Sequence, residues 1–265
     1  MKKYNPIFFL LFILLVMGAF ASMAQNSYGM KIIGGVAFAF SLVFINEFIS
    51  AFRKKGEKDI YSLLELFCLF VLALLFGLRV FYVHFSFIEW LFAITSAILA
   101  LLYLKKMRTR FSEVYPNNKY LGMLVLFFHA GIILFFVSMA LTPFNPGIAE
   151  MIGIAAFVSL IIYLVAGLFK RDHLLEGIKV SGFSLVRHFR DHSIIIAAIF
   201  FLLSLYLGLN RLGIVPGVYS DEYPKAYFQL VNDAASKKEK VVNGKYKYEE
   251  FMEKYKSFVR HAKAK

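Results

Sequence analysis

Residues 62–83 read SLLELFCLFVLALLFGLRVFYV, and residues 87–104 read FIEWLFAITSAILALLYL. Each run is long enough to cross, as a helix, a hydrocarbon layer that is roughly 30 Å thick. Because only three residues separate the two runs, they are predicted to be antiparallel neighbours in a helical hairpin. This hairpin indicates a polytopic membrane protein, and the other segments are interpreted around it.

Apolar runs of similar length lie on both sides of the hairpin. They cover residues 30–50, 119–141, 148–169 and 193–209, which gives six spans in all. Residues 1–26 add a further apolar segment with two open interpretations. Lys2 and Lys3 before an apolar stretch, with a small-x-small site at Ser22–Ala24, are typical of a secretory signal peptide. The same segment is also long enough to be a first transmembrane helix.

The sequence therefore predicts an all-α fold, a polytopic bundle of six or seven transmembrane helices followed by a short helical tail outside the membrane. The bundle occupies residues 27–212, and the tail occupies residues 213–265. A composition that is 60% hydrophobic and 18% aromatic is too apolar for an ordinary soluble domain. The single cysteine, Cys68, lies within a span, which excludes an intramolecular disulfide.

The net charge of +13 is distributed unevenly along the chain. Residues 51–60, 105–119 and 170–192 carry four, five and five lysines or arginines, whereas the connections at 84–86 and 142–147 carry none. By the positive-inside rule, the three basic segments face the cytoplasm. The charge thus indicates membrane orientation rather than a nucleic-acid partner. In the inner membrane of a bacterial cell, which the signal-like start favours, the tail is predicted to be periplasmic.

The tail contains an apolar stripe at helical spacing. Its members are Tyr248, Phe251, Met252, Tyr255, Phe258 and Val259. A stripe on so short a segment needs a partner surface or the membrane to cover it, so we expect it to dock a membrane or periplasmic protein. Asn243-Gly244 is a turn signal, and the residues beside it could instead form a short β-hairpin from Val241-Val242 and residues 246–248.

Two charges lie at the outer ends of the central hairpin. Arg79 comes four residues before the end of the first run, and Glu89 comes two residues into the second. A turn near residues 84–86 places both at similar depth, and an ionisable residue in a span is costly unless it is paired or hydrated. We therefore expect an Arg79–Glu89 ion pair. A structural anchor is favoured over a gate or ion path.

Glu47 and Glu65 flank the first basic loop, so both carboxylates are predicted to lie at similar depth near the cytoplasmic face. Two close carboxylates can share a proton, which is what a proton-coupled site requires. Asn46 could add a hydrogen bond. The alternative is that the lysines and arginines of the loop between them simply neutralise both groups.

Three histidines are further candidates. His129 lies near the middle of its span, where we expect it to bond a neighbouring helix through Ser138 or a backbone carbonyl rather than to bind haem. His188 and His192 are four residues apart, a spacing that suits metal ligands on a helix. The apolar and basic residues around them favour an amphipathic segment on the membrane surface instead. We expect no metal and no cofactor.

One span differs from the others in its small residues. Ala149, Gly153, Ala156 and Ser159 recur three or four positions apart within residues 148–169. Small residues on one face let helix backbones approach closely in lipid. We therefore expect this helix to be the central one of the bundle.

Three classes of function compete. The first is a non-catalytic integral subunit of an envelope assembly, with the bundle as anchor and the tail as docking element. The second is a small proton-coupled transporter or channel that uses Glu47, Glu65, Asn46 and His129. The third, an intramembrane enzyme, is disfavoured because no catalytic cluster or nucleotide, nucleophile or zinc motif is present in the sequence. The first class is preferred.

Overall fold

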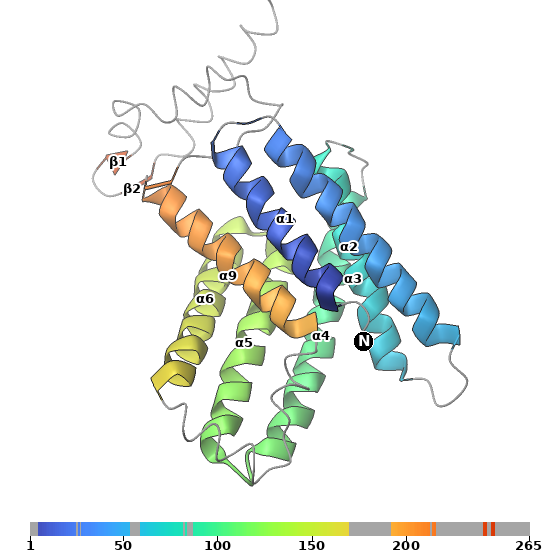
Figure 1. The fold of residues 1–265 in the computed structure, drawn as a ribbon. Coiled ribbons are helices and arrows are strands. Elements are labelled where there is room, and N and C mark those ends of the chain that lie inside the picture. The colour runs from blue at the N-terminus through green and yellow to red at the C-terminus, as the bar shows by residue number, and fades with distance from the viewer. Residues whose placement is uncertain are drawn as a thin grey trace, which may run out of the picture. The chain divides into compact units, whose positions relative to one another are not determined.

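The computed structural model of the chain describes residues 5–24, 26, 28–53, 59–81, 83, 87–169, 192–212, 214–215, 241–242 and 245–246. Within these ranges the elements are α1 (Asn5–Met23), α2 (Tyr28–Arg53), α3 (Ile60–Val80), α4 (Ile88–Val114), α5 (Lys119–Leu141), α6 (Pro146–Phe169), α9 (His192–Arg211), β1 (Val241–Val242) and β2 (Lys245–Tyr246) (Figure 1). By length and composition, seven of the described helices can cross a membrane. The predicted all-α polytopic bundle is thus confirmed.

The chain divides into two compact units, which are described separately. The larger consists of Met1–Ile13 and Gly34–Leu205, and the smaller consists of Leu14–Ile33 and Tyr206–Lys265. The larger unit contains α3, α4, α5 and α6 in full, together with the start of α1, most of α2 and the first two-thirds of α9.

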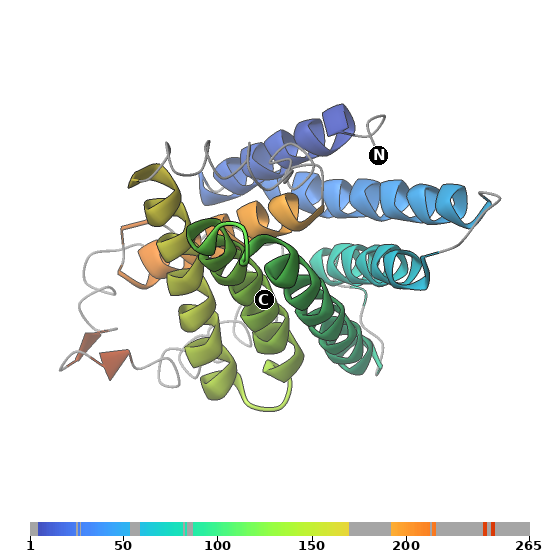
Figure 2. The ribbon, with the colours of Figure 1, turned by 90° about the horizontal axis from the view of Figure 1, so that it is seen from below.

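In the larger unit, successive helices are neighbours. α3 packs on α4, α4 on α5, and α5 on α6, as both ribbon views show (Figures 1 and 2). The hairpin of α3 and α4 on which the sequence interpretation rests is therefore present. Side chains from α4 and α5 form the most deeply buried part, with Leu99, Tyr103, Ile132 and Phe136 almost fully enclosed. Large apolar side chains such as Leu101 point outward, as expected for a surface in contact with lipid.

The expectation that α6 is the central helix is wrong, because α5 lies between α4 and α6. Among the described contacts, the small residues Ala149, Gly153, Ala156 and Ser159 of α6 meet α5, while α6 also meets α9 through Phe157 and Phe201. Ala156 and Ser159 are buried toward α5, whereas Met151 and Ile154 are exposed. Small residues permit one close approach, but they do not require that a helix be surrounded.

The interface of α5 and α6 combines close packing with hydrogen bonds to backbone. A Cβ added to Gly131 would lie 2.7 Å from Leu160 Cγ and 3.2 Å from the carbonyl oxygen of Ala156. Ser159 Oγ donates to the carbonyl of Phe127 at 2.9 Å, and Ser138 Oγ donates to that of Ala149 at 2.6 Å. Hydroxyl-to-carbonyl bonds of this kind hold helices together where there is no water to compete.

Two helix boundaries differ from the predicted ones. The basic segment 105–119 was expected to be a loop, but α4 continues to Val114, since lysine, arginine and methionine are good helix formers and no glycine or proline intervenes. The side chain of Asn118 then accepts a hydrogen bond from Leu121 N and caps the start of α5. At the other end, α9 already begins at His192, which was expected to belong to the preceding loop.

In the smaller unit, the end of α1 lies close against the start of α2. A Cβ at Gly29 would come within 2.3 Å of the backbone nitrogen of Ser22, so only glycine fits there. Residues 5–23 are helical, which suits a transmembrane helix, while cleavage as a signal peptide stays a prediction. In the tail, β1 and β2 pair antiparallel, with Val241 opposite Tyr246. The alternative hairpin was predicted from Val241-Val242 and residues 246–248, and its second strand is instead Lys245–Tyr246. The docking stripe lies outside the described residues.

Candidate functional site

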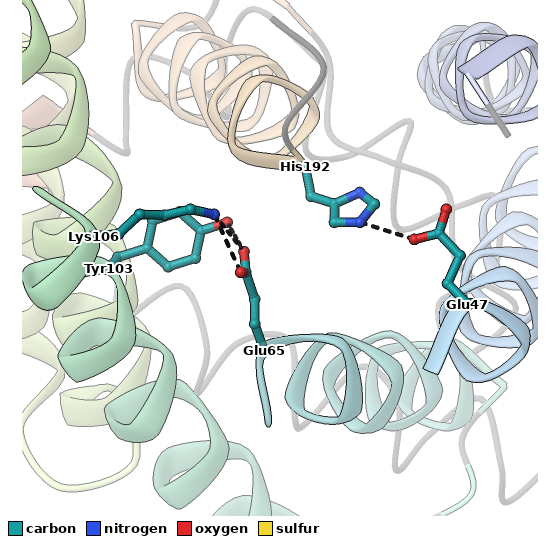
Figure 3. A network of polar contacts seen from close by, with 5 residues as sticks. All are labelled: Glu47, Glu65, Tyr103, Lys106 and His192. Carbon is teal, nitrogen blue, oxygen red and sulfur yellow. Dashed lines mark hydrogen bonds and ion pairs between the residues drawn. The ribbon is translucent and has the colours of Figure 1, made fainter. Parts of the chain in front are cut away.

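Two clusters of ionisable side chains lie within the larger unit (Figure 3). The first, here called the Glu47 pair, consists of Glu47 from α2 and His192, the first residue of α9. The second, here called the Glu65 network, consists of Glu65 from α3 with Tyr103 and Lys106 from α4. The Glu47 pair joins two helices that are far apart in the chain, and the Glu65 network joins two consecutive antiparallel helices. Each cluster therefore depends on the tertiary fold.

The Glu47 pair is buried. Nε2 of His192 lies 2.9 Å from Oε2 of Glu47, and the two side chains are only 6% and 7% exposed. The contact has the distance of an ion pair. Within the described part of the chain, neither His192 Nε2 nor the second oxygen of Glu47 makes a hydrogen bond. A carboxylate in such surroundings depends on the charge of the imidazole opposite, because burial removes the water that would otherwise solvate it.

Aromatic rings enclose the imidazole of His192. The rings of Phe8 from α1 and Phe44 from α2 meet it edge to face, with centroids at 5.2 and 5.4 Å. Phe40, which lies one helical turn before Phe44 in α2, stacks on Phe8. These rings keep the surroundings of the pair apolar and fix the orientation of the imidazole, and a positive imidazolium is attracted to the negative faces of aromatic rings.

The Glu65 network is partly exposed and fully hydrogen-bonded. The Tyr103 hydroxyl donates to Glu65 Oε1 at 2.8 Å, while Lys106 Nζ donates to both carboxylate oxygens at 3.1 and 3.2 Å. Tyr103 is itself completely buried, and its ring lies 5.0 Å from the ammonium of Lys106. The carboxylate thus has a neutral donor and a charged donor, both on α4. This arrangement ties α3 to α4.

The structure gives the two predicted carboxylates separate partners. Glu47 faces His192, and Glu65 faces Tyr103 and Lys106, as Figure 3 shows. A basic side chain therefore faces each carboxylate, Lys106 at Glu65 and the imidazole of His192 at Glu47, whereas lysines 54, 55 and 58 of the loop between them lie outside the described residues. Sharing of one proton between the two carboxylates stays a prediction. Asn46 lies on the exposed side of α2, away from the buried face that carries Glu47.

The outer end of the hairpin is different. Arg79 and Glu89 are both exposed, and the described residues contain no ion pair between them. The connection of α3 to α4, residues 81–87, is longer than the three residues that the apolar runs suggested. The two charges consequently lie on helix ends where they can be hydrated, which removes the need for pairing.

His129 is completely buried in α5. Its Nδ1 lies 2.8 Å from the carbonyl oxygen of Val125, one turn earlier, and its ring meets that of Phe128 edge to face. A contact with a backbone carbonyl was predicted, but it is made within the same helix rather than across to a neighbour. Ser138, the other predicted partner, bonds α6 instead.

Metal binding finds no support among the residues that the structure describes, since they contain no group of three or more potential ligands. Of the candidate pair of histidines, His192 faces Glu47, and His188 lies outside the described residues. Comparison with known proteins adds no further constraint, because no protein-family model, curated protein or solved structure matches this chain.

Sequence reasoning missed three of the residues in these clusters. Tyr103 and Lys106 were assigned to the end of an apolar run and to a basic loop, and His192 was considered only with His188. The spacing of Tyr103 and Lys106, three residues apart at the end of a span, does place both on one face of a helix. No comparable signal links His192 to Glu47, because 145 positions separate them.

Proposed function

We propose that this chain is a non-catalytic integral subunit of a protein assembly in the bacterial inner membrane. The helical bundle anchors the subunit, and the C-terminal tail docks a partner on the periplasmic side. The support for the location is the distribution of lysine and arginine between alternate connections. The support for docking is the apolar stripe of the tail, which needs a covering surface.

One observation carries the non-catalytic part of this proposal. Two pairs of ionisable groups in the described spans join helices, Glu65 with Lys106 between α3 and α4 and Glu47 with His192 between α2 and α9. Such cross-helix pairs fix which helices are neighbours. Ionisable groups that are paired between helices in this way suit an anchor better than a catalyst, which needs reactive groups that face a substrate.

The docking role predicts selective loss of a partner. Replacing the six stripe residues Tyr248, Phe251, Met252, Tyr255, Phe258 and Val259 by alanine should abolish co-purification of the partner in mild detergent, since the apolar contact is removed. Deleting residues 217–265 should have the same effect. The measurement is quantitative mass spectrometry after affinity purification, repeated with the tag on the partner.

The matched control changes the opposite face of the same segment. Replacing Glu253 and Arg260 by serine leaves the stripe intact, so the partner should be retained at the unaltered level. The proposal fails if the native chain purifies alone, or if the alanine variant and the serine variant retain the same proteins in the same amounts.

A proton-coupled transporter or channel is the second candidate, and the burial of the Glu47 pair favours it. A carboxylate and an imidazole that face one another inside a bundle can accept and release protons during transport. The described helices are continuous, however, and the broken spans that form the substrate sites of many transporters are not seen among them.

Purified protein in liposomes tests this second candidate. If the chain carries protons, changing Glu47 to Gln should reduce proton uptake driven by a membrane potential by at least about tenfold, because the proton acceptor is lost. The variant Glu65→Gln serves for comparison, since Glu65 already has two donors. Uptake no faster than in protein-free liposomes, or uptake that survives in both variants, argues against the transporter.

A further inference from the structure

The Glu47 pair and the Glu65 network differ in the chemistry of their cations. A lysine ammonium keeps its charge across the physiological range, whereas imidazole ordinarily changes charge between about pH 5 and 8. The two clusters therefore make different kinds of contact between helices. The tie between α3 and α4 uses a lysine ammonium. The tie between α2 and α9 depends on a proton.

The number of protons fixes the net charge of the Glu47 pair. With one proton, the pair carries no net charge, whether as carboxylate and imidazolium or as carboxylic acid and imidazole. Without that proton, it carries one negative charge. The two side chains are only 6% and 7% exposed, so almost no water can stabilise the net negative charge of the deprotonated pair. In that state the carboxylate and the neutral imidazole also lose the attraction of an ion pair.

Among the described residues, Glu47 has one ion-pair partner, His192, and the ring contacts of His192 are those with Phe8 and Phe44. Glu65, Tyr103 and Lys106, the other ionisable side chains drawn in Figure 3, are bonded to each other. A deprotonated pair can relieve its charge by separating or by admitting water.

We propose that Glu47 and His192 form a proton-binding site that controls the attachment of the first turn of α9 to α2. With the proton bound, the ion pair and its aromatic enclosure hold His192 against α2. When the proton is lost, the buried carboxylate faces a neutral ring, and the start of α9 moves away from α2. This site does not depend on either function proposed above, because an anchor and a transporter could both contain it.

His192 is the first residue of α9, directly after residues 170–191, which carry five lysines or arginines. The proposed movement would therefore occur at the end of α9 that adjoins this basic segment.

The distance between α2 and α9 tests the proposal in the full chain. Spin labels are placed at the exposed positions Ile49 and Leu202 in a Cys68→Ser background, and the protein is reconstituted in lipid nanodiscs. Pulsed electron paramagnetic resonance then gives the distance between the labels at about pH 6 and about pH 8.5, two values between which a free imidazole ordinarily loses most of its charge. At the higher pH, the distance should increase, or its distribution should widen, by an amount on the order of 2 Å.

Three variants make the result specific. Glu47→Gln should remove the response to pH, because no buried charge is created when the imidazole is neutral. Glu65→Gln should leave the response intact. If Glu47→Gln does not fold, the double variant Glu47→Gln with His192→Gln, which has no titratable group at the site, should show no response.

Several outcomes overturn the proposal. It is wrong if the unaltered bundle shows the same distance at both pH values, if the response persists in Glu47→Gln or in the double variant, or if Glu65→Gln abolishes it as well. Because the readout is a distance, a failure here is separate from a failure of partner docking or of proton uptake.

Discussion

Replacing His192 by leucine is expected to lower the free energy of unfolding by about 3–5 kcal/mol, the largest effect we predict for a single side chain. The reason is the position of the partner. Glu47 is 7% exposed and loses its only ionisable contact among the described residues, so a buried carboxylate is left without a cation. Leucine keeps most of the apolar volume beside Phe8 and Phe44, so lost packing contributes little.

Equilibrium denaturation in detergent measures this loss, and a second substitution isolates its cause. In the double variant Glu47→Leu with His192→Leu, no buried charge remains, and most of the stability should return. Arg79→Gln is the comparison at an exposed charge and should change stability by no more than about 0.5 kcal/mol. A double variant as unstable as His192→Leu would show that packing, and not charge, governs the site.

Gly131→Val is the second large expected effect, at about 3 kcal/mol of lost stability. Even a single added Cβ would lie 2.7 Å from Leu160 Cγ and 3.2 Å from the Ala156 carbonyl oxygen, and valine adds two further methyl groups. The two helices would have to separate, which would also stretch the hydrogen bond from Ser159 to Phe127 at the same interface. Thermal unfolding in detergent, followed by circular dichroism, gives the size of the loss.

The chain offers both a control and a rescue for this substitution. Gly35 also lies in a helix, but a Cβ there meets nothing within 4 Å, so Gly35→Val should cost less than about 1 kcal/mol. Combining Gly131→Val with Leu160→Ala removes the nearest obstructing side chain and should recover part of the stability. Equal losses for Gly131→Val and Gly35→Val would mean that helix propensity, rather than the contact with α6, explains the effect.

The Glu65 network shows how far sequence reasoning could have gone. In an antiparallel hairpin that turns near residue 85, twenty positions in either direction lead to Glu65 and to Lys105. The same symmetry that placed Arg79 beside Glu89 therefore places Glu65 beside the basic end of the second run. Lys106, the next residue, makes the contact. This pair was predictable, and it was missed because the basic segment was treated as a loop.

The outer charges show where that reasoning ends. Arg79 and Glu89 satisfied the same symmetry, yet both are exposed and no ion pair between them is present in the described residues. Symmetry gives the depth of a residue along a helix but not the direction in which its side chain points around the helix. Glu65 faces α4, whereas Arg79 does not face Glu89, and only packing determines that rotation.

The sequence by itself determined the fold class, the approximate limits of the spans and the small-residue face of α6, because each follows from the chemistry of residues near one another in the chain. Apolar length decides whether a helix can cross a bilayer, and spacing decides which residues share its face. Only the tertiary structure decided that α5 lies between α4 and α6 and that Glu47 faces His192. Those outcomes depend on which helices become neighbours, and that choice is a balance of packing over the whole bundle rather than a property of any one segment.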